Sequence, residues 1–136
     1  MEKLVKLILL SLLVSTLSIS SLFSQDDIIV YEVQIGNLTP GKIELAEFIP
    51  QEELNIFKRN SNTPGDMIVK SYEMTIIRKN AEPINTLNKG GKFSAESLHQ
   101  IKQLKKGDTI YFDRILGEIP GGETDKKFPS LVFKII

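Results

Sequence analysis

The amino-acid sequence predicts a mainly β fold: an antiparallel, Ig-like β-sandwich that carries one or two short helices. Three observations favour this fold class. Apolar and polar residues alternate in several separate segments, which is typical of strands with one buried face. Strand segments follow one another directly, without the alternation of strands and helices that builds a parallel sheet. The chain has 136 residues, which is enough for one domain of this kind.

The first two predicted strands flank a turn. In the segment 28–36, the apolar residues that share one face are Ile29, Tyr31, Val33 and Ile35. Pro40–Gly41 suits the central positions of a type II turn, because proline presets φ and glycine accepts a positive φ. A second strand is expected to return through Ile43 and Leu45.

The longest strand pattern covers residues 66–80, and its alternation changes register partway. Tyr72, Met74 and Ile76 share one face, whereas Met67 and Val69 have the opposite parity. Either the strand is buried on both faces there, or a β-bulge near Lys70–Ser71 resets the register, and we expect the bulge. Two further strands are predicted, one through Ile110 and Phe112 and one through Leu131, Phe133 and Ile135, with residues 120–130 as a hairpin-like loop between them.

One helix is clearly predicted after Ser94. The Ser94 hydroxyl is a good N-cap, Leu98 and Ile101 fall on one helical face, and Gly107 suits the position just after the helix. A second, shorter helix of one or two turns is expected from Pro50, because proline is favoured at the first helical position and acidic residues follow it.

The first residues have the pattern of a secretory signal peptide. Lys3 and Lys6 precede an uncharged apolar run at 7–17, and small residues follow. Cleavage is expected after Ser24, with Ser20 as the alternative, so residues 1–24 form the signal peptide and 25–136 a single domain. An uncleaved membrane anchor is disfavoured because the apolar run is too short to span a bilayer. Export to the periplasm follows, with outer-membrane association or secretion left open.

Composition and motifs exclude most kinds of chemistry. The chain has no cysteine and a formal net charge of zero, so thiol chemistry is excluded and a nucleic-acid footprint is not indicated. His99 is the single histidine and is interpreted as a surface residue. The glycine-rich stretches 88–92 and 120–126 do not match a phosphate-binding loop. We expect a protein that is not an enzyme and that has no catalytic residue, cofactor or metal ion.

The candidate partner-binding residues are Lys102, Lys105, Lys106 and Tyr111. The three lysines form a small basic patch near the end of the predicted helix, and the alternative interpretation is a solvated helix end stabilised by its dipole. A contact face is expected to include this patch and the loop after Gly117. A periplasmic small-ligand or glycan-binding sandwich is the alternative function, for which Tyr111 is the candidate aromatic platform.

Several motifs resemble the C-terminal periplasmic domain of the gliding-motility protein GldM, part of the type IX secretion system of Bacteroidetes. A turn with Asn88, Gly90, Phe93 and Ser94 leads into the helix. The sequence "LKKGDTIYF" follows, and the chain closes with "FKI". The resemblance covers about residues 36–136. It implies a β-rich, sandwich-like domain with short helices and a mechanical or scaffolding role.

The resemblance also implies partners and a location. GldM is long, with a transmembrane helix and several periplasmic domains in series, whereas this sequence reads as a signal peptide followed by one domain. We therefore expect an exported, non-catalytic protein-interaction module, accessory to type IX secretion or gliding, without a transmembrane anchor after processing. The expected partner is a protein of the cell envelope, such as a secretion-ring component or GldM, and homodimer formation is left open. No nucleic-acid partner is expected.

Overall fold

A computed structural model describes residues 29–59 and 66–136. The signal peptide predicted at 1–24, its cleavage sites and the start of the domain at 25 lie outside the described residues. No helix within the described ranges is long and apolar enough to cross a membrane. The elements in chain order are β1 (Tyr31–Gln34), β2 (Gly41–Ile43), α2 (Leu45–Phe48), β3 (Asn55–Lys58), β4 (Ile68–Ile77), β5 (Ile84–Lys89), α3 (Ala95–Lys102), β6 (Thr109–Glu118), β7 (Lys126–Phe128) and β8 (Leu131–Ile135).

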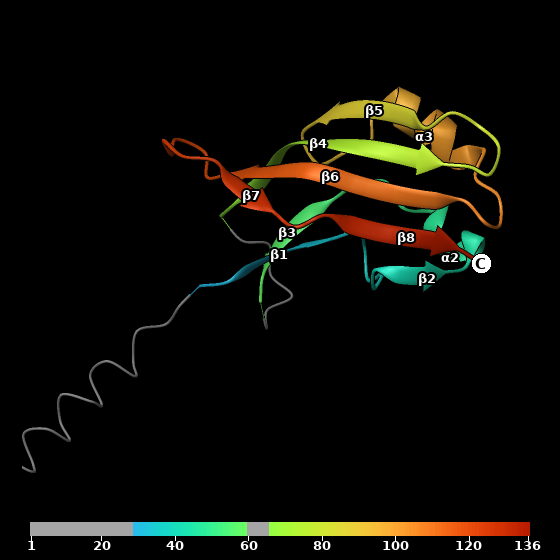
Figure 1. Cartoon of the computed structure of the whole chain (residues 1–136). Helices are drawn as coiled ribbons and strands as arrows, with labels where there is room; N and C mark the ends of the chain where they lie inside the picture. The colour runs from blue at the N-terminus through green and yellow to red at the C-terminus, as the bar shows by residue number, and fades with distance from the viewer. Residues whose placement is uncertain (1–28, 60–65) are drawn as a thin grey trace, which may run out of the picture.

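The strands form two sheets, and the fold is mainly β, as the sequence predicts (Figure 1). The larger sheet has the order β2-β8-β6-β4-β5, and β7 pairs with the far end of β6. The smaller sheet is the antiparallel pair β1-β3. Neighbouring strands are antiparallel except β2 and β8, which run parallel. The structure thus confirms a β-sandwich with short helices and adds one parallel pair to the predicted antiparallel arrangement.

The core lies against one face of the larger sheet and is rich in aromatic rings. Phe112 of β6 is fully buried at its centre. Its ring centroid lies 5.9 Å from that of Phe93, in a stacked arrangement, and 6.1 Å from those of Tyr72 and Phe133. Phe48 of α2 lies 5.4 Å from Phe133. The larger sheet, α2 and the segment before α3 therefore meet at Phe112.

The register change predicted in β4 is confirmed. Pairing with β6 shifts between Val69 and Ser71 and again between Ser71 and Glu73. The shift allows both parities to face inward, so Val69 is 5% exposed and Tyr72 is fully buried. A bulge of this kind allows apolar side chains on both sides of it to point into the core.

Helix α3 begins as predicted but ends earlier. The N–H of Ser97 donates to the Ser94 hydroxyl over 3.1 Å, which confirms the N-cap. The helix ends at Lys102, with Gln103 as its C-cap, so the prediction that Gly107 follows the helix directly is wrong. Gly107 has φ of 95° and lies in the next turn, where the N–H of Asp108 donates to the carbonyl of Lys105 over 3.1 Å.

Strand β5 was not predicted, because its buried face is polar. Thr86 and Asn88 are buried, whereas Leu87 between them is 64% exposed. The Asn88 Oδ1 atom accepts hydrogen bonds from the Ser94 N–H at 2.8 Å and from the Ser97 hydroxyl at 2.9 Å. The hydroxyls of Thr86 and Ser97 are 2.7 Å apart. Polar groups that satisfy one another therefore hold α3 on this edge strand.

The segment 40–58 departs most from prediction. The strand expected to continue through Leu45 ends at Ile43, and Leu45 starts α2 instead. The helix expected from Pro50 is absent there, and the chain enters β3, in which Ile56 is 4% exposed. Burial explains both differences. A helical turn at 45–48 directs Phe48 into the aromatic core, where it is fully buried, and an extended segment after Pro50 buries Ile56.

Three smaller predictions also need correction. Ile29 was expected on a buried face but is 56% exposed and precedes β1. The hydrogen-bonded turn after β1 joins the Leu38 N–H to the Ile35 carbonyl over 3.0 Å, upstream of the predicted turn at Pro40–Gly41, and Gly41 begins β2. The predicted loop at 120–130 contains β7, which forms a hairpin with β6.

Replacement of Asn88 tests the polar attachment of α3. In Asn88→Ala, the Ser94 N–H and the Ser97 hydroxyl lose their buried acceptor, which should lower the free energy of unfolding by about 1–3 kcal/mol. Denaturant unfolding measures the loss, and amide exchange should rise first across α3. Asn85→Ala on the same strand, where the amide bonds Thr75 at the surface, should change stability by less than about 0.5 kcal/mol. Equal losses in the two variants would contradict a structural role for the buried network.

The buried phenol of Tyr72 predicts alkaline instability. Burial raises the pKa of Tyr72 above its ordinary value, so the folded state keeps a proton that the unfolded chain releases above about pH 10. The unfolded state then binds fewer protons, and stability falls as pH rises, by up to about 1.4 kcal/mol per pH unit. Tyr72→Phe should remove this slope, whereas Tyr111→Phe should retain it. Unfolding free energies at successive alkaline pH values provide the measurement, and an unchanged slope in Tyr72→Phe would assign the effect to another group.

Candidate interaction surface

A tight turn between α3 and β6 carries two of the predicted site residues. The carboxylate Oδ2 of Asp108 accepts the Lys105 N–H over 2.9 Å and lies 3.2 Å from Nε of Arg78. The Asp108 side chain is 7% exposed. This partly buried ion pair fixes the turn while the side chains of Lys105 and Lys106 remain exposed.

The turn is also joined to the end of the chain. The Gly107 N–H donates to the Ile135 carbonyl over 2.8 Å, and the Ile135 N–H donates to the Asp108 carbonyl over 2.9 Å. The Ile136 N–H donates to the Ile43 carbonyl over 3.0 Å. Backbone bonds therefore tie the lysine turn, the end of β8 and the end of β2 together at one end of the molecule.

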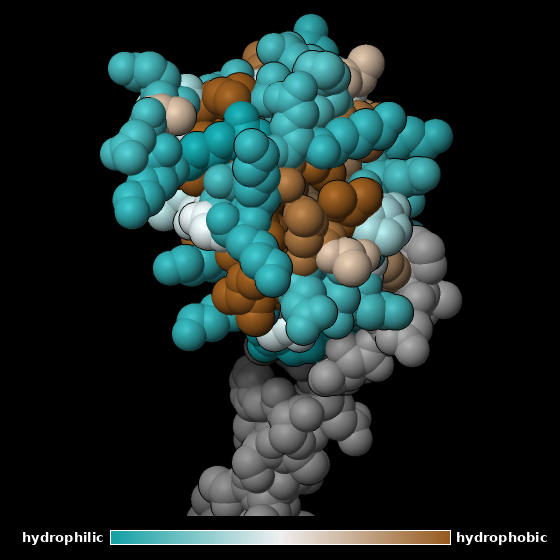
Figure 2. All heavy atoms as spheres, turned by 90° about the vertical axis from the view of Figure 1, so that its right-hand side faces the viewer, coloured by the Kyte–Doolittle hydropathy of each residue, from teal (hydrophilic) through white to brown (hydrophobic). Residues whose placement is uncertain are grey.

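An apolar depression lies beside this turn. We call it the end surface, and its lining residues are Glu44, Leu45, Ala46, Ile49, Lys106 and Ile136. Ile49 is 40% exposed and Ile136 is 49% exposed. Figure 2 views the molecule from this end and shows an apolar area bordered by hydrophilic side chains. The combination of apolar area and polar border is typical of protein interaction sites.

The predicted site residues do not all gather on the end surface. Lys106 lines it, and Lys105 is its neighbour in the turn. Lys102 is exposed at the last turn of α3. Tyr111 is half-buried on the outer face of the larger sheet, paired with Thr75 on one side and Val132 on the other.

The loop after Gly117 lies far from the lysines. The strand β6 has 10 residues, with the lysine turn before its start and this loop after its end (Figure 1). At about 3.3 Å per residue the separation is about 30 Å, so the lysines and the loop do not form one contiguous face. The sequence pattern does not predict the end surface, because it places Leu45 in a strand and does not indicate that Ile49 and Ile136 lie near each other.

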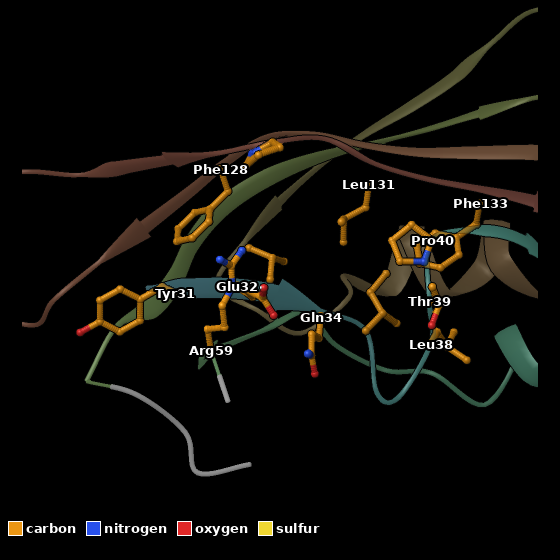
Figure 3. A pocket seen from close by; sticks show the side chains of 13 residues that line it. Tyr31, Glu32, Gln34, Leu38, Thr39, Pro40, Arg59, Phe128, Leu131 and Phe133 are labelled. Atoms are coloured by element: carbon orange, nitrogen blue, oxygen red, sulfur yellow. Dashed lines mark hydrogen bonds and ion pairs between the residues drawn. The ribbon is translucent and has the colours of Figure 1, made fainter. Parts of the chain in front are cut away.

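A second concave region lies between the two sheets (Figure 3). We call it the β1 groove, and it has a volume of about 420 Å³. Its lining residues are Tyr31, Glu32, Val33, Gln34, Ile35, Leu38, Thr39, Pro40, Arg59, Phe128, Pro129, Leu131 and Phe133. Tyr31 was expected in the core but is half-buried at the mouth of this groove.

The single histidine, which was considered for chemistry, is a surface residue. His99 is exposed, and its Nε2 atom lies 3.2 Å from Nε2 of Gln103. Within residues 29–59 and 66–136, no group of three or more histidine, cysteine, aspartate or glutamate side chains is placed to hold a metal ion.

Fold and surface define a small β-sandwich domain whose prominent features are an apolar end bordered by lysines and a groove between its sheets. Comparison with known protein families matches residues 57–136 to the GldM C-terminal domain, and the chain belongs to that family. The match confirms the resemblance found in the sequence. It begins within β3, so β1, β2 and α2 lie outside it. A search of curated proteins gave no match.

Removal of the Asp108 carboxylate tests the construction of the lysine turn. Asp108→Ala leaves Arg78, whose side chain is 21% exposed, without its partner and should cost about 2–3 kcal/mol of unfolding free energy. The matched control is Asp125→Ala, which breaks an exposed pair with Lys70 and should cost less than about 1 kcal/mol. Denaturant unfolding of both variants provides the measurement. Equal costs would show that the Asp108 pair contributes no more than a surface pair.

Proposed function

We propose that the protein is an exported, non-catalytic interaction module that is accessory to the type IX secretion and gliding machinery. In this proposal, residues 1–24 direct export and are removed, and the domain acts in the periplasm without a membrane anchor. Membership of the GldM C-terminal domain family carries the proposal. The partner is a protein of the cell envelope, either a component of the secretion ring or GldM.

The end surface supplies a contact of suitable chemistry. Exposed aliphatic side chains at Ile49 and Ile136 provide apolar area, and Lys106 lies at its border. The border carries both Lys106 and Glu44, so an apolar centre with charges of both signs around it favours a protein partner with apolar residues and complementary charges. Lys102 and Lys105 extend the positive charge along the adjoining turn and helix end.

Affinity capture of the tagged protein from the cell envelope of its own bacterium tests this proposal, with mass spectrometry to identify what is recovered. We expect recovery of secretion-ring proteins or of GldM. Charge reversal of Lys102, Lys105 and Lys106 to glutamate should reduce that recovery at least about tenfold. The turn should survive this change, because Lys105 bonds Asp108 through its backbone N–H.

The matched control reverses three exposed lysines elsewhere, Lys79, Lys89 and Lys127, which changes the net charge by the same amount. This variant should recover the partner as the unmodified protein does. Recovery without any secretion-ring protein or GldM would overturn the proposed role. Equal recovery of the partner by both triple variants would show that Lys102, Lys105 and Lys106 do not contribute to the contact.

A further inference from the structure

Strand β1 pairs with β3 along one backbone edge, and among the described residues no strand pairs with its other edge. The Arg59 N–H donates to the Val30 carbonyl over 2.7 Å, and the β1–β3 register continues this pairing to Gln34. Backbone groups alternate between the two edges of a strand. Glu32 and Gln34 therefore direct their N–H and carbonyl groups toward β3, whereas Tyr31 and Val33 direct theirs to the opposite edge.

The β1 groove runs along that second edge. Consecutive residues of β1, whose side chains point to opposite faces of the strand, all line the groove. The groove therefore follows the edge of the strand and not one of its faces. Its other wall comes from the end of β7 and the start of β8, where Phe128 and Leu131 point toward β1 (Figure 3). An unpaired edge beside an apolar wall is the arrangement that accepts an added strand.

The charge at one end of the groove selects the added strand. The Nζ atom of Lys126 lies 5.5 Å from the centroid of the Tyr31 ring and 5.4 Å from that of Phe128. No carboxylate in the described part of the chain pairs with Lys126, whereas Arg59 is already paired with Glu32 at 2.7 Å. A cation held between two rings is well placed to meet an incoming carboxylate.

We propose that the β1 groove binds an extended, acidic segment of a partner protein, which adds to β1 as a third strand of the smaller sheet. Its backbone pairs with Tyr31 and Val33, alternate apolar side chains face Phe128 and Leu131, and an acidic side chain meets Lys126. A second copy of this chain fits less well. Antiparallel pairing of two β1 edges would place the uncharged Gln34 end of the partner strand, and no acidic residue, near Lys126.

Amide hydrogen exchange, followed by NMR, tests this proposal directly. The probe is a short acetylated and amidated peptide, Glu-Val-Thr-Val-Thr-Val-Glu, whose blocked ends leave side-chain carboxylates as its only negative charges. In the free protein, the amides of Glu32 and Gln34 should exchange slowly and those of Tyr31 and Val33 quickly. Saturation with the peptide should slow the latter two at least about tenfold.

Matched reagents separate strand addition from nonspecific adhesion. N-methylation of the peptide at the residues that face β1 should abolish the protection, because it removes backbone donors and leaves the side chains in place. Lys126→Glu should abolish it for the acidic peptide and transfer it to the peptide with lysine in place of glutamate. Lys127→Glu, at the next and oppositely directed position of β7, should change nothing.

Three results would overturn the proposal. The first is slow exchange of the Tyr31 and Val33 amides in the free monomer. The second is unchanged exchange of these two amides at millimolar concentrations of the peptide. The third is protection that rises with protein concentration alone, which would assign the edge to a second copy. The β1 groove does not include the lysine turn, so each of these results is independent of the capture experiment at the end surface.

Discussion

The packing around Phe112 is the constraint on which the rest of the fold depends. The larger sheet presents one apolar face, and within residues 29–59 and 66–136 the elements that cover it are two short helices and a two-stranded sheet. Phe112 is the point where these pieces meet, since its ring contacts Phe93 before α3, Phe48 of α2 and Phe133 of β8. Aromatic rings suit this task because each buries a large area and packs well at several angles.

Membership of the GldM C-terminal domain family explains only part of this core. The matched residues 57–136 include most of the larger sheet and α3. The segment before them adds Ile43 in β2 and Phe48 in α2, both of which are buried. It also builds one wall of the end surface and one wall of the β1 groove. Each concave surface therefore combines matched residues with residues outside the match.

The elements that could be predicted from the sequence are those in which local preference and burial agree. The alternation of β6 and β8 corresponds to a buried face, and the Ser94 cap forms as its sequence position indicates. The irregularity in β4 could also be predicted, because a bulge is one of the two arrangements that bury apolar residues of both parities in one strand.

The elements that could not be predicted depend on partners distant in sequence. The buried face of β5 consists of Thr86 and Asn88. These polar side chains can be buried because they form hydrogen bonds with Ser97 and Ser94. Helix α2 has four residues and too few turns to show a period, and the aromatic core decides its position. The sequence indicates Lys102, Lys105, Lys106 and Tyr111 as candidate contact residues. Two of the apolar residues beside Lys106, Leu45 and Ala46, belong to that same unpredicted helix.

The parallel pairing of β2 with β8 has a consequence for how the chain reaches its folded state. β8 lies between β2 and β6, so the strand that comes last in the described order fills an interior position of the sheet. Until β8 is in place, β2 lacks the strand that it pairs with, and the side chains of Ile43 and Phe48 lack their cover. Folding that depends on such long-range pairing is slow and begins late. The topology therefore makes the burial of the segment 41–48 depend on a strand that lies far from it in the sequence.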